Sequence, residues 1–321
     1  MLRRLIRSNA CVLYGVVDRA RQMRDVALGA ALTGGDPSTA LRATRGADLS
    51  RALEGTTVVV TGASSGIGRA VALRAAAAGA RVVLVARSAD ALSVLEGEIR
   101  NCGGRARSFA ADLSSGASTA DLLTRLSAHG VEVDVLVNNA GRSIRRPIDE
   151  SYDRLHDFER TMALNYFGSL RLILGLLPGM RARKRGHVIN VSSAGVQMST
   201  PMFSAYVASK AALDAFTRVA ASEARADEVR FSTVYMPLVR TPMIAPTPAF
   251  RNARALSPEQ AAELVLRPLV TRERALGTRL AELWHLGQVV APDALEGMLA
   301  WANRVLAGSN RQECAPPSRA A

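Results

Sequence analysis

The chain has 321 residues, of which 48% are hydrophobic and 21% are charged, so it can build a large buried core and is not expected to be disordered. Its formal net charge of +13 is a feature that many nucleic-acid-binding proteins share. However, the arginines are scattered along the chain and only 4% of the residues are aromatic, so platforms for base stacking are scarce. We therefore expect no nucleic-acid partner.

The cysteines and histidines indicate no metal site. Cys11, Cys102 and Cys314 are far apart in the sequence, and none of the four histidines is paired at ligand spacing. An odd, widely spaced set of cysteines also predicts no disulfide framework, and a reducing, cytoplasmic compartment is the default expectation. No uninterrupted apolar run approaches the roughly 20 residues that a membrane-spanning helix needs.

Residues 1–54 are predicted to form an N-terminal extension. Residues 1–30 combine several arginines with apolar residues near helical spacing, which predicts a basic amphipathic helix. Such a helix can make peripheral contact with an anionic membrane surface, or it can pack on its own domain or a sister subunit. The sequence favours these two interpretations about equally. Residues 31–54, rich in Gly, Thr, Ser, Ala and Arg, are predicted to be a linker.

A regular alternation of strands and helices begins at residue 55. Short β-branched runs occur at 57–62, 81–87, 107–112, 133–141, 187–193 and 229–237, and helical stretches between them at 66–79, 88–101, 117–129, 153–183 and 203–226. This alternation predicts an α/β fold with a doubly wound parallel sheet, Rossmann-like, with ligands at the carboxyl ends of the strands. We assign 55–255 to a catalytic domain and 256–321 to a C-terminal helical extension. The usual seventh strand is not evident near 270–290.

The first strand leads directly into the glycine-rich stretch 61-TGASSGIGRA-70. Gly62 permits a tight turn, Gly66 lets the backbone approach a phosphate, and Gly68 lets the next helix pack on the strand. The N-terminus of that helix supplies N–H donors and a positive dipole for a pyrophosphate. Because the glycines end a strand and open a helix, the stretch predicts dinucleotide binding.

The end of the second strand indicates which dinucleotide is bound. A carboxylate at this place would bind the ribose hydroxyls of NAD. The chain has Ala86 at that position and Arg87 next to it, and a guanidinium can bind a 2′-phosphate bidentately. The predicted cofactor is therefore NADP(H).

Three further motifs follow in order: 138-NNAG-141, 191-VSSAG-195 and Tyr206-x-x-x-Lys210. Tyr206 and Lys210 are one helical turn apart, which places their side chains on one face of a helix. The chain has only two lysines among 41 basic side chains, so lysine at position 210 indicates a need for a compact ammonium group. An ammonium group near a phenol favours the phenolate and lowers the tyrosine pKa.

Together with TGASSGIG, these motifs make residues 55–245 similar to the short-chain dehydrogenase/reductase family. The resemblance implies that Tyr206 is the general acid and that Lys210 lowers its pKa and binds the nicotinamide ribose. It also implies that Ser193 hydrogen-bonds the reacting oxygen, with Ser192 the less favoured neighbour, and that Asn165 holds a proton-relay water. The cofactor-binding residues that it implies are Gly62, Ser64, Ser65, Gly66, Ile67, Gly68, Arg87, Asp112, Leu113, Asn139, Ala140, Gly141, Tyr206, Lys210, Pro237, Val239 and Thr241.

The segments 138–168 and 235–247 are similar, more narrowly, to bacterial long-chain fatty acyl-CoA reductases. This resemblance implies NADPH-dependent reduction of a long-chain acyl thioester to a fatty aldehyde. All three cysteines lie away from the motifs, so we expect direct hydride transfer and no cysteine acyl-enzyme. Two alternatives stay open: an NADPH-dependent carbonyl reductase for a keto-lipid or aldehyde, and a non-catalytic NADPH-binding scaffold, which the intact catalytic set disfavours.

Arg142, Arg145 and Arg146 directly follow the NNAG turn at the end of the fourth strand. We hypothesise that at least one of them faces the mouth of the site and binds CoA phosphates; a solvated surface loop is the equally weighted alternative.

The apolar, proline-rich stretch 242–250 has the composition of a substrate loop. Met243, Ile244 and Phe250 are its candidates for lining an acyl channel. The family resemblance also implies a homodimer or homotetramer that packs through the helices at 153–183 and 203–226.

Overall fold

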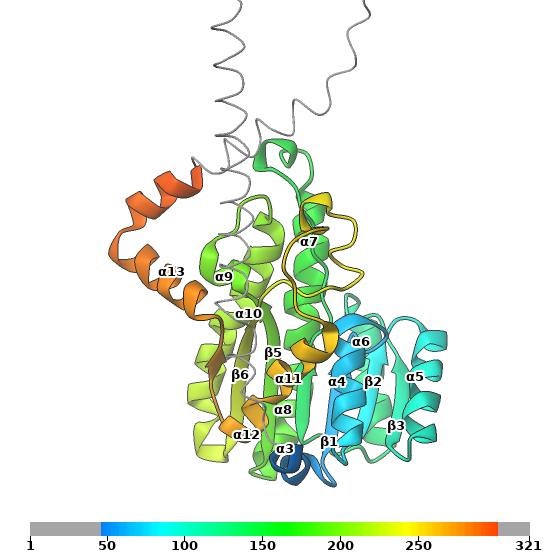
Figure 1. Cartoon of the computed structure of the whole chain (residues 1–321). Helices are drawn as coiled ribbons and strands as arrows, with labels where there is room; N and C mark the ends of the chain where they lie inside the picture. Colours follow the sequence, from blue (N-terminus) through cyan, green and yellow to red (C-terminus); the bar gives the residue numbers. More distant parts are fainter. Residues whose placement is uncertain (1–45, 301–321) are drawn as a thin grey trace, which may run out of the picture.

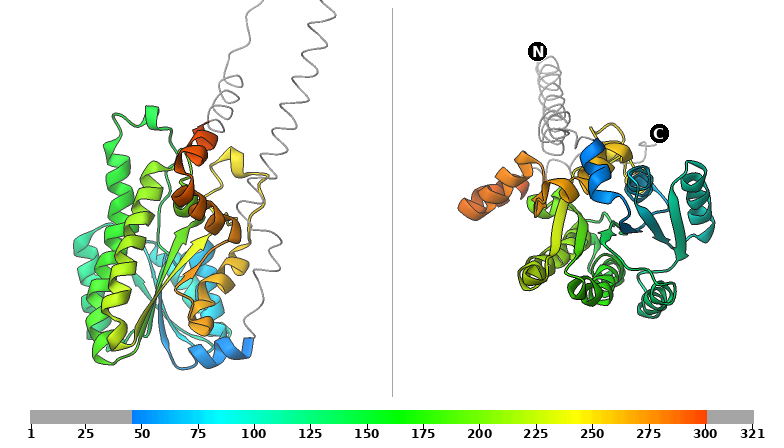
Figure 2. Two further views of the ribbon diagram at one scale, coloured as in Figure 1. Left: turned by 90° about the vertical axis from the view of Figure 1, so that its left-hand side faces the viewer. Right: turned by 90° about the horizontal axis from the view of Figure 1, so that it is seen from below.

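The structure is a computed structural model and describes residues 46–300. The predicted amphipathic helix at 1–30, the first part of the predicted linker, and residues 301–321 lie outside the described residues, as do Cys11 and Cys314. Helices cover both faces of a central sheet (Figures 1 and 2), so the predicted doubly wound α/β architecture is confirmed.

The sheet has seven parallel strands in the order β3-β2-β1-β4-β5-β6-β7. Their bounds are β1 Thr57–Thr61, β2 Arg81–Ala86, β3 Arg105–Ala110, β4 Val135–Asn138, β5 Gly186–Ser193, β6 Val229–Met236 and β7 Ala275–Leu276. The strand order changes direction between β1 and β4, and a parallel sheet binds ligands at such a switch point, outside the carboxyl ends of its strands.

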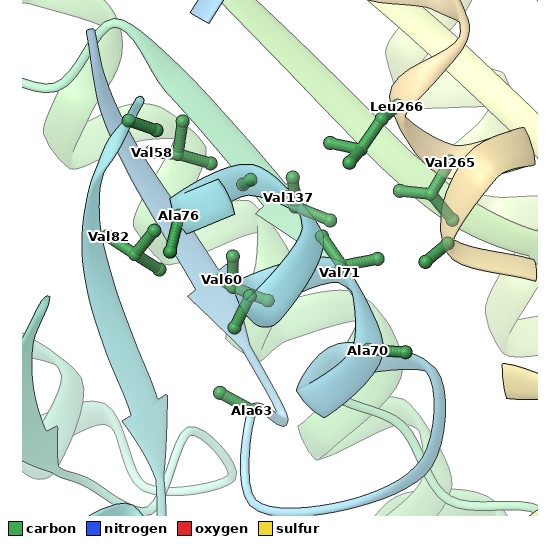
Figure 3. Packing of buried hydrophobic residues seen from close by; sticks show 14 of the residues in the cluster. Val58, Val60, Ala63, Ala70, Val71, Ala76, Val82, Val137, Val265 and Leu266 are labelled. Atoms are coloured by element: carbon green, nitrogen blue, oxygen red, sulfur yellow. The ribbon is translucent and has the colours of Figure 1, made fainter. Parts of the chain in front are cut away.

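The helices form two layers. One face of the sheet packs against α3 Gly46–Leu53, α4 Gly66–Ala77, α5 Ala89–Asn101 and α11 Pro258–Leu266. The other packs against α6 Gly116–Ala128, α8 Ser169–Ala182 and α10 Ser204–Glu223. Successive strand residues point to opposite layers, so β1 places Val58 and Val60 in the first core and Val59 in the second. Figure 3 shows Val58 and Val60 beside α4, with Val265 and Leu266 of α11 completing that core.

Two sequence expectations about the elements were wrong. A seventh strand does exist: β7 pairs with β6 through Thr233↔Ala275 and Val234↔Leu276, and it is too short to give a sequence signal. Residues 46–53 are no linker, because they form α3, whose Leu49 and Leu53 are fully buried. The predicted helical stretch at 153–183 is present, and a π-helical turn η2 Ala163–Gly168 joins α7 Leu155–Met162 to α8.

Within the described residues, the region after residue 255 is mostly helical, and its first helix belongs to the core. Ser257 caps α11 in a reciprocal capping box with Gln260, and Pro258 occupies the first turn, where its missing N–H costs nothing. Beyond α11 follow α12 Pro268–Thr271, β7, α13 Arg279–Val290 and helical residues 292–300. The proposed domain limits at 54/55 and 255/256 stay predictions. No helix within 46–300 combines the length and the apolar character that crossing a bilayer requires.

Candidate active site

A cavity of about 290 Å³ opens at the carboxyl ends of β5 and β6, and three of the four predicted catalytic residues, Ser193, Tyr206 and Lys210, line it. Its lining joins Ser193 and Tyr206 to apolar side chains from β6, from the loops and helices at the carboxyl end of the sheet, and from residues 292–300. These apolar side chains are Ile67, Met198, Pro201, Phe203, Val207, Met236, Leu238, Val239, Met243, Ile244, Phe250 and Leu299. A cavity with few polar groups on one wall and apolar side chains elsewhere is suited to a lipid-like substrate with one reacting oxygen.

The glycine-rich turn has the geometry that a bound phosphate needs. Gly62 adopts φ +65°, a conformation that side-chain-bearing residues rarely take. A Cβ atom on Gly68 would lie 2.3 Å from the Gly62 carbonyl oxygen, so only glycine permits the close packing of α4 on β1. At the N-terminus of α4, Ser65 makes no side-chain capping bond and the first turn has no acidic residue. The amide groups of that turn are thus suited to an anion.

Thr61 fixes the turn after β4 to the end of β1, a role that the sequence analysis missed. Its Oγ1 accepts hydrogen bonds from the backbone N–H groups of Asn139 and Ala140, each at 2.9 Å, and donates one to the Val137 carbonyl at 3.2 Å. The Asn139 side chain in turn donates to the Thr61 carbonyl at 2.9 Å. The only sequence signal for this role is that Thr61, a β-branched residue with a hydroxyl group, ends the strand directly before the glycine-rich stretch.

Arg87 and Asp112 lie at the carboxyl ends of β2 and β3, which are neighbours in the sheet. Hydrogen bonds from the Ser114 side chain and amide group hold the pKa of Asp112 below its usual value, and the guanidinium groups of Arg87 and Arg142 act in the same direction. Arg87 is exposed, so its guanidinium can reach a ligand on this side of the switch point.

Asn165 is fully buried in η2, and its side chain connects three parts of the site. Its Oδ1 accepts from the Arg142 amide group at 2.8 Å, and its Nδ2 donates both to the Arg142 carbonyl and to Ser209 Oγ, each at 2.9 Å. The Ser209 hydroxyl donates to the Tyr206 carbonyl at 2.7 Å. Both N–H groups of the amide are therefore used within the protein, and the predicted water-holding role of Asn165 stays a prediction. A π-helical turn at such a position is typical of functional sites.

Ser193, Tyr206 and Lys210 come together as predicted from their spacing. The Ser193 side chain hydrogen-bonds Tyr206 and also accepts from the Gly195 amide group at 3.0 Å. Lys210 is buried, and its Nζ donates to the Val191 carbonyl at 2.8 Å. Ser192 also lines the cavity, but its hydroxyl has no hydrogen-bond partner within the described residues.

The expected lowering of the tyrosine pKa is not found in the protein alone. Burial raises the pKa of Tyr206 above its usual value, and the Ser193 hydrogen bond opposes that effect only in part. Burial also lowers the pKa of Lys210 to about 8. The reason is the same for both groups: an apolar cavity wall disfavours the phenolate and the ammonium alike.

Lys210 should make the stability of the unliganded protein depend on pH. Its pKa is about 8 when folded and near 10.5 when exposed, so the unfolded chain binds more protons between these values. The free energy of unfolding should therefore rise with pH from about 8, by about 1 kcal/mol per pH unit, until the tyrosines begin to ionise near pH 10. Urea denaturation of wild type and Lys210→Met, compared between pH 7 and 10, measures this difference. Equal slopes for the two proteins would contradict it.

The three arginines after β4 have three different environments. Arg146 donates from Nε to the buried Asp157 carboxylate at 3.2 Å, and its amide group donates to the Met202 carbonyl at 2.7 Å. The Arg142 backbone is held by Asn165. Arg145 is the exposed member of the set and the one that lines the cavity.

The stretch 242–250 forms one wall of the cavity, as predicted. Met243, Ile244 and Phe250 all line it, and Phe250 stacks on Phe203 with ring centroids 6.1 Å apart. Phe203 was not singled out from the sequence, because it precedes α10 in a loop without a periodic pattern. Within residues 46–300, no group of three His, Cys, Asp or Glu side chains is placed to hold a metal ion.

Comparison with known proteins adds a family and several relatives. A family model described as short chain dehydrogenase matches residues 56–252. The chain is 49% identical over 241 residues to a fatty acyl-CoA reductase of Acinetobacter baylyi, an alignment that covers 75% of this chain and 82% of the relative. It is 43% identical to a fatty acyl-CoA reductase of Mycobacterium tuberculosis, covering 81% and 86% of the two chains.

A solved structure shows the same architecture. The crystal structure of a 3-oxoacyl (acyl-carrier-protein) reductase from Agrobacterium tumefaciens with NADP bound superposes with a TM-score of 0.66 at 28% identity. The match covers 74% of this chain and 97% of that chain.

Proposed function

Since this chain belongs to the short chain dehydrogenase family and is an oxidoreductase, we propose that it reduces a long-chain fatty acyl-CoA thioester to a fatty aldehyde with NADPH. The observation that carries the proposal is the cavity, in which Ser193 and Tyr206 stand on one wall, apolar side chains cover most of the rest, and Arg145 lies in the lining. The two fatty acyl-CoA reductases that resemble this chain support the substrate class.

The residues present fit a phosphorylated dinucleotide. The turn at 62–68 leaves no room for a Cβ at Gly68 and presents the uncapped N-terminus of α4, which suits a pyrophosphate. Arg87 at the end of β2 suits a 2′-phosphate, and Lys210 and Asn139 lie in the cavity lining where the nicotinamide half would be held. Bound NADPH supplies the hydride.

The protein's own groups then act on the substrate oxygen. When hydride adds to the thioester carbon, negative charge develops on the oxygen; Ser193 hydrogen-bonds it and Tyr206 transfers its phenolic proton to it. The resulting hemithioacetal breaks its C–S bond, giving aldehyde and CoA thiolate, and the alcohol proton returns to the phenolate. The CoA thiolate takes one proton from solvent to become free CoA, so each thioester consumes one hydride and one proton. Lys210 stabilises the transient phenolate, which matters most in a site where burial raises the pKa of Tyr206.

The test is an assay of the purified full-length protein with NADPH and palmitoyl-CoA. We expect cofactor oxidation in step with release of free CoA and formation of an aldehyde that a hydrazine reagent traps. If only 3-oxoacyl thioesters or free aldehydes are reduced, the enzyme is a carbonyl reductase, the second candidate, which its likeness to the 3-oxoacyl reductase fold favours. No turnover with any of these substrates would reject both.

Arg87 should determine the cofactor preference. Arg87→Asp removes a bidentate partner of the 2′-phosphate and adds repulsion, so kcat/KM for NADPH should fall about 10- to 100-fold. The value for NADH should not fall, because NADH has no phosphate at that position. Arg105→Asp is the matched control and should leave both values unchanged. Arg105 is also exposed, but it lies at the start of β3, at the end of the sheet away from the site. Equal losses with both cofactors would contradict this role.

Arg145 is our candidate for binding CoA phosphates, because Arg146 is engaged with Asp157. Arg145→Glu should raise KM for palmitoyl-CoA by about tenfold or more. KM for decanal, which has no phosphate, should stay within about twofold and so serves as the internal control. An unchanged KM for palmitoyl-CoA would show that the arginine is an ordinary surface residue.

We also propose a homodimer or homotetramer in the cytoplasm. Exposed apolar side chains on η2, α8 and α10 support an interface on these elements: Phe167 (43% exposed), Leu174 (54%) and Val219 (57%). Such residues in one region are typical of association surfaces.

A further inference from the structure

The strongest unexplained feature is an apolar stripe on the outer side of α13. Its inner side faces the protein: Ala281 is fully buried, and Gln288 donates to Ser199 Oγ at 2.9 Å. On the outer side lie four aliphatic residues at helical spacing, which we call the outer stripe: Leu283 (65% exposed), Leu286 (58%), Val289 (72%) and Val290 (74%). The inner side of α13 is already in contact with the protein, so the outer stripe is an apolar face that no other part of the described chain covers.

The outer stripe is near the cavity and at the same end of the molecule as other exposed apolar residues. Residues 292–300 follow α13 and carry Met298, which is 45% exposed, and Leu299, which lines the cavity. Figures 1 and 2 show α13, the loop around 240–254 and the start of α7 all toward the end of the sheet at which the strands finish. On two of these segments Met243 (46% exposed) and Leu155 (68%) also reach the surface.

The charges at this end favour a phosphate-bearing surface. Residues 240–254 contain Arg240, Arg251 and Arg254, all exposed, and no Asp or Glu. None of the three has a carboxylate partner among the ion pairs of the described chain. By contrast, α13 carries Arg279 and Glu282, and residues 292–300 carry the exposed Asp293 and Glu296. The outer stripe therefore contributes apolar contact, and the arginines of 240–254 contribute the attraction to anions.

We propose that this end of the protein binds the surface of an anionic lipid bilayer, with the outer stripe inserted among the acyl chains and the arginines of 240–254 on headgroup phosphates. The cavity entrance then faces the bilayer. A long acyl chain can pass between the lipid phase and the apolar cavity without crossing water, which would cost about 0.8 kcal/mol for each exposed CH₂ group. The residues that form this surface all belong to the described range 46–300, and its occupancy does not depend on which carbonyl group is reduced.

The test is co-sedimentation of the full-length protein with vesicles of phosphatidylcholine, with and without phosphatidylglycerol. Wild type should bind the mixed vesicles. A triple variant, Leu283→Ser, Leu286→Ser and Val290→Ser, should bind them at least about tenfold more weakly. Arg251→Glu combined with Arg254→Glu should remove the preference for phosphatidylglycerol. Val290→Ser should weaken binding measurably, whereas the matched control Val94→Ser should not, since Val94 is 72% exposed on α5.

Each other outcome overturns the proposal. Undiminished binding of the triple variant would assign membrane contact to another part of the chain, such as residues 1–30. A change in its oligomeric mass, with vesicle binding intact, would identify a second copy of the chain as the occupant of the stripe. Reduction of decanal in vesicle-free buffer should be equal in wild type and triple variant, which separates loss of docking from loss of the proposed chemistry.

Discussion

Tyr206→Phe should lower kcat by about 10²–10⁴-fold with palmitoyl-CoA or decanal, while the Kd for NADPH stays within about twofold. The substitution removes one oxygen from a buried cavity wall and leaves the ring in place, so the lining keeps its shape. What disappears is the proton that the developing oxyanion takes up, together with the hydrogen bond to Ser193. Single-turnover kinetics and fluorescence titration with NADPH measure the two quantities separately.

The control is Tyr152→Phe, the same chemical change at a side chain that is 83% exposed. Its kcat should equal that of wild type. If Tyr206→Phe keeps more than about a tenth of wild-type kcat, proton transfer by this phenol is not required, and the proposed mechanism fails with it.

Gly68→Ala should destabilise the protein by about 1–3 kcal/mol or more and abolish the stabilisation that NADPH provides. The new Cβ would lie 2.3 Å from the Gly62 carbonyl oxygen and 2.5 Å from Asn139 Nδ2, so either α4 moves away from β1 or the hydrogen bond from Asn139 to Thr61 breaks. Both changes displace the turn that would hold the pyrophosphate. Urea denaturation without NADPH measures the loss in the free energy of unfolding, and the same experiment with NADPH measures the stabilisation that the cofactor provides.

Gly97→Ala is its matched control. Gly97 also lies within a helix, α5, but a Cβ at this position meets nothing within 4 Å. Alanine has the higher helix propensity, so this variant should gain about 0.5–1 kcal/mol and keep the response to NADPH. A Gly68→Ala protein as stable as wild type would mean that α4 can shift without cost, which the packing in Figure 3 argues against.

The parts of the site that depend on local spacing could be predicted from the sequence. Tyr206 and Lys210 are one turn apart on α10, and the glycines at 62–68 join a strand to a helix, so their positions follow from secondary structure alone. The strand alternation gave six of the seven strands for the same reason. β7 was missed because its two residues pair with β6 only after the chain returns from α12, and no periodic pattern develops over so short a stretch.

Properties that depend on tertiary burial could not be predicted in this way. The expected lowering of the Tyr206 pKa considered only the neighbouring ammonium, whereas enclosure by the cavity wall reverses the sign in the unliganded protein. The hydrogen bonds that the Asn165 side chain donates to the Arg142 carbonyl and to Ser209 could not be predicted either, because both partners are far from it in the sequence. Arg145 and Arg146 were equivalent candidates until Asp157 of α7 was found beside one of them.

The π-helical turn η2 determines how α7 is rotated about the helix axis relative to α8. One residue corresponds to about 100° of rotation in an α-helix, so a wider turn inserted between α7 and α8 rotates everything before it relative to everything after it. Asp157 lies in α7, before the insertion, and Asn165 lies within it, and each contacts the segment that follows β4. Deleting a single residue from 163–168 would therefore rotate α7 relative to α8. Asp157 and Asn165 could then no longer contact Arg146 and Arg142 at the same time. The length of the segment 163–168 is therefore as much a part of the site as its side chains, because both contacts depend on it.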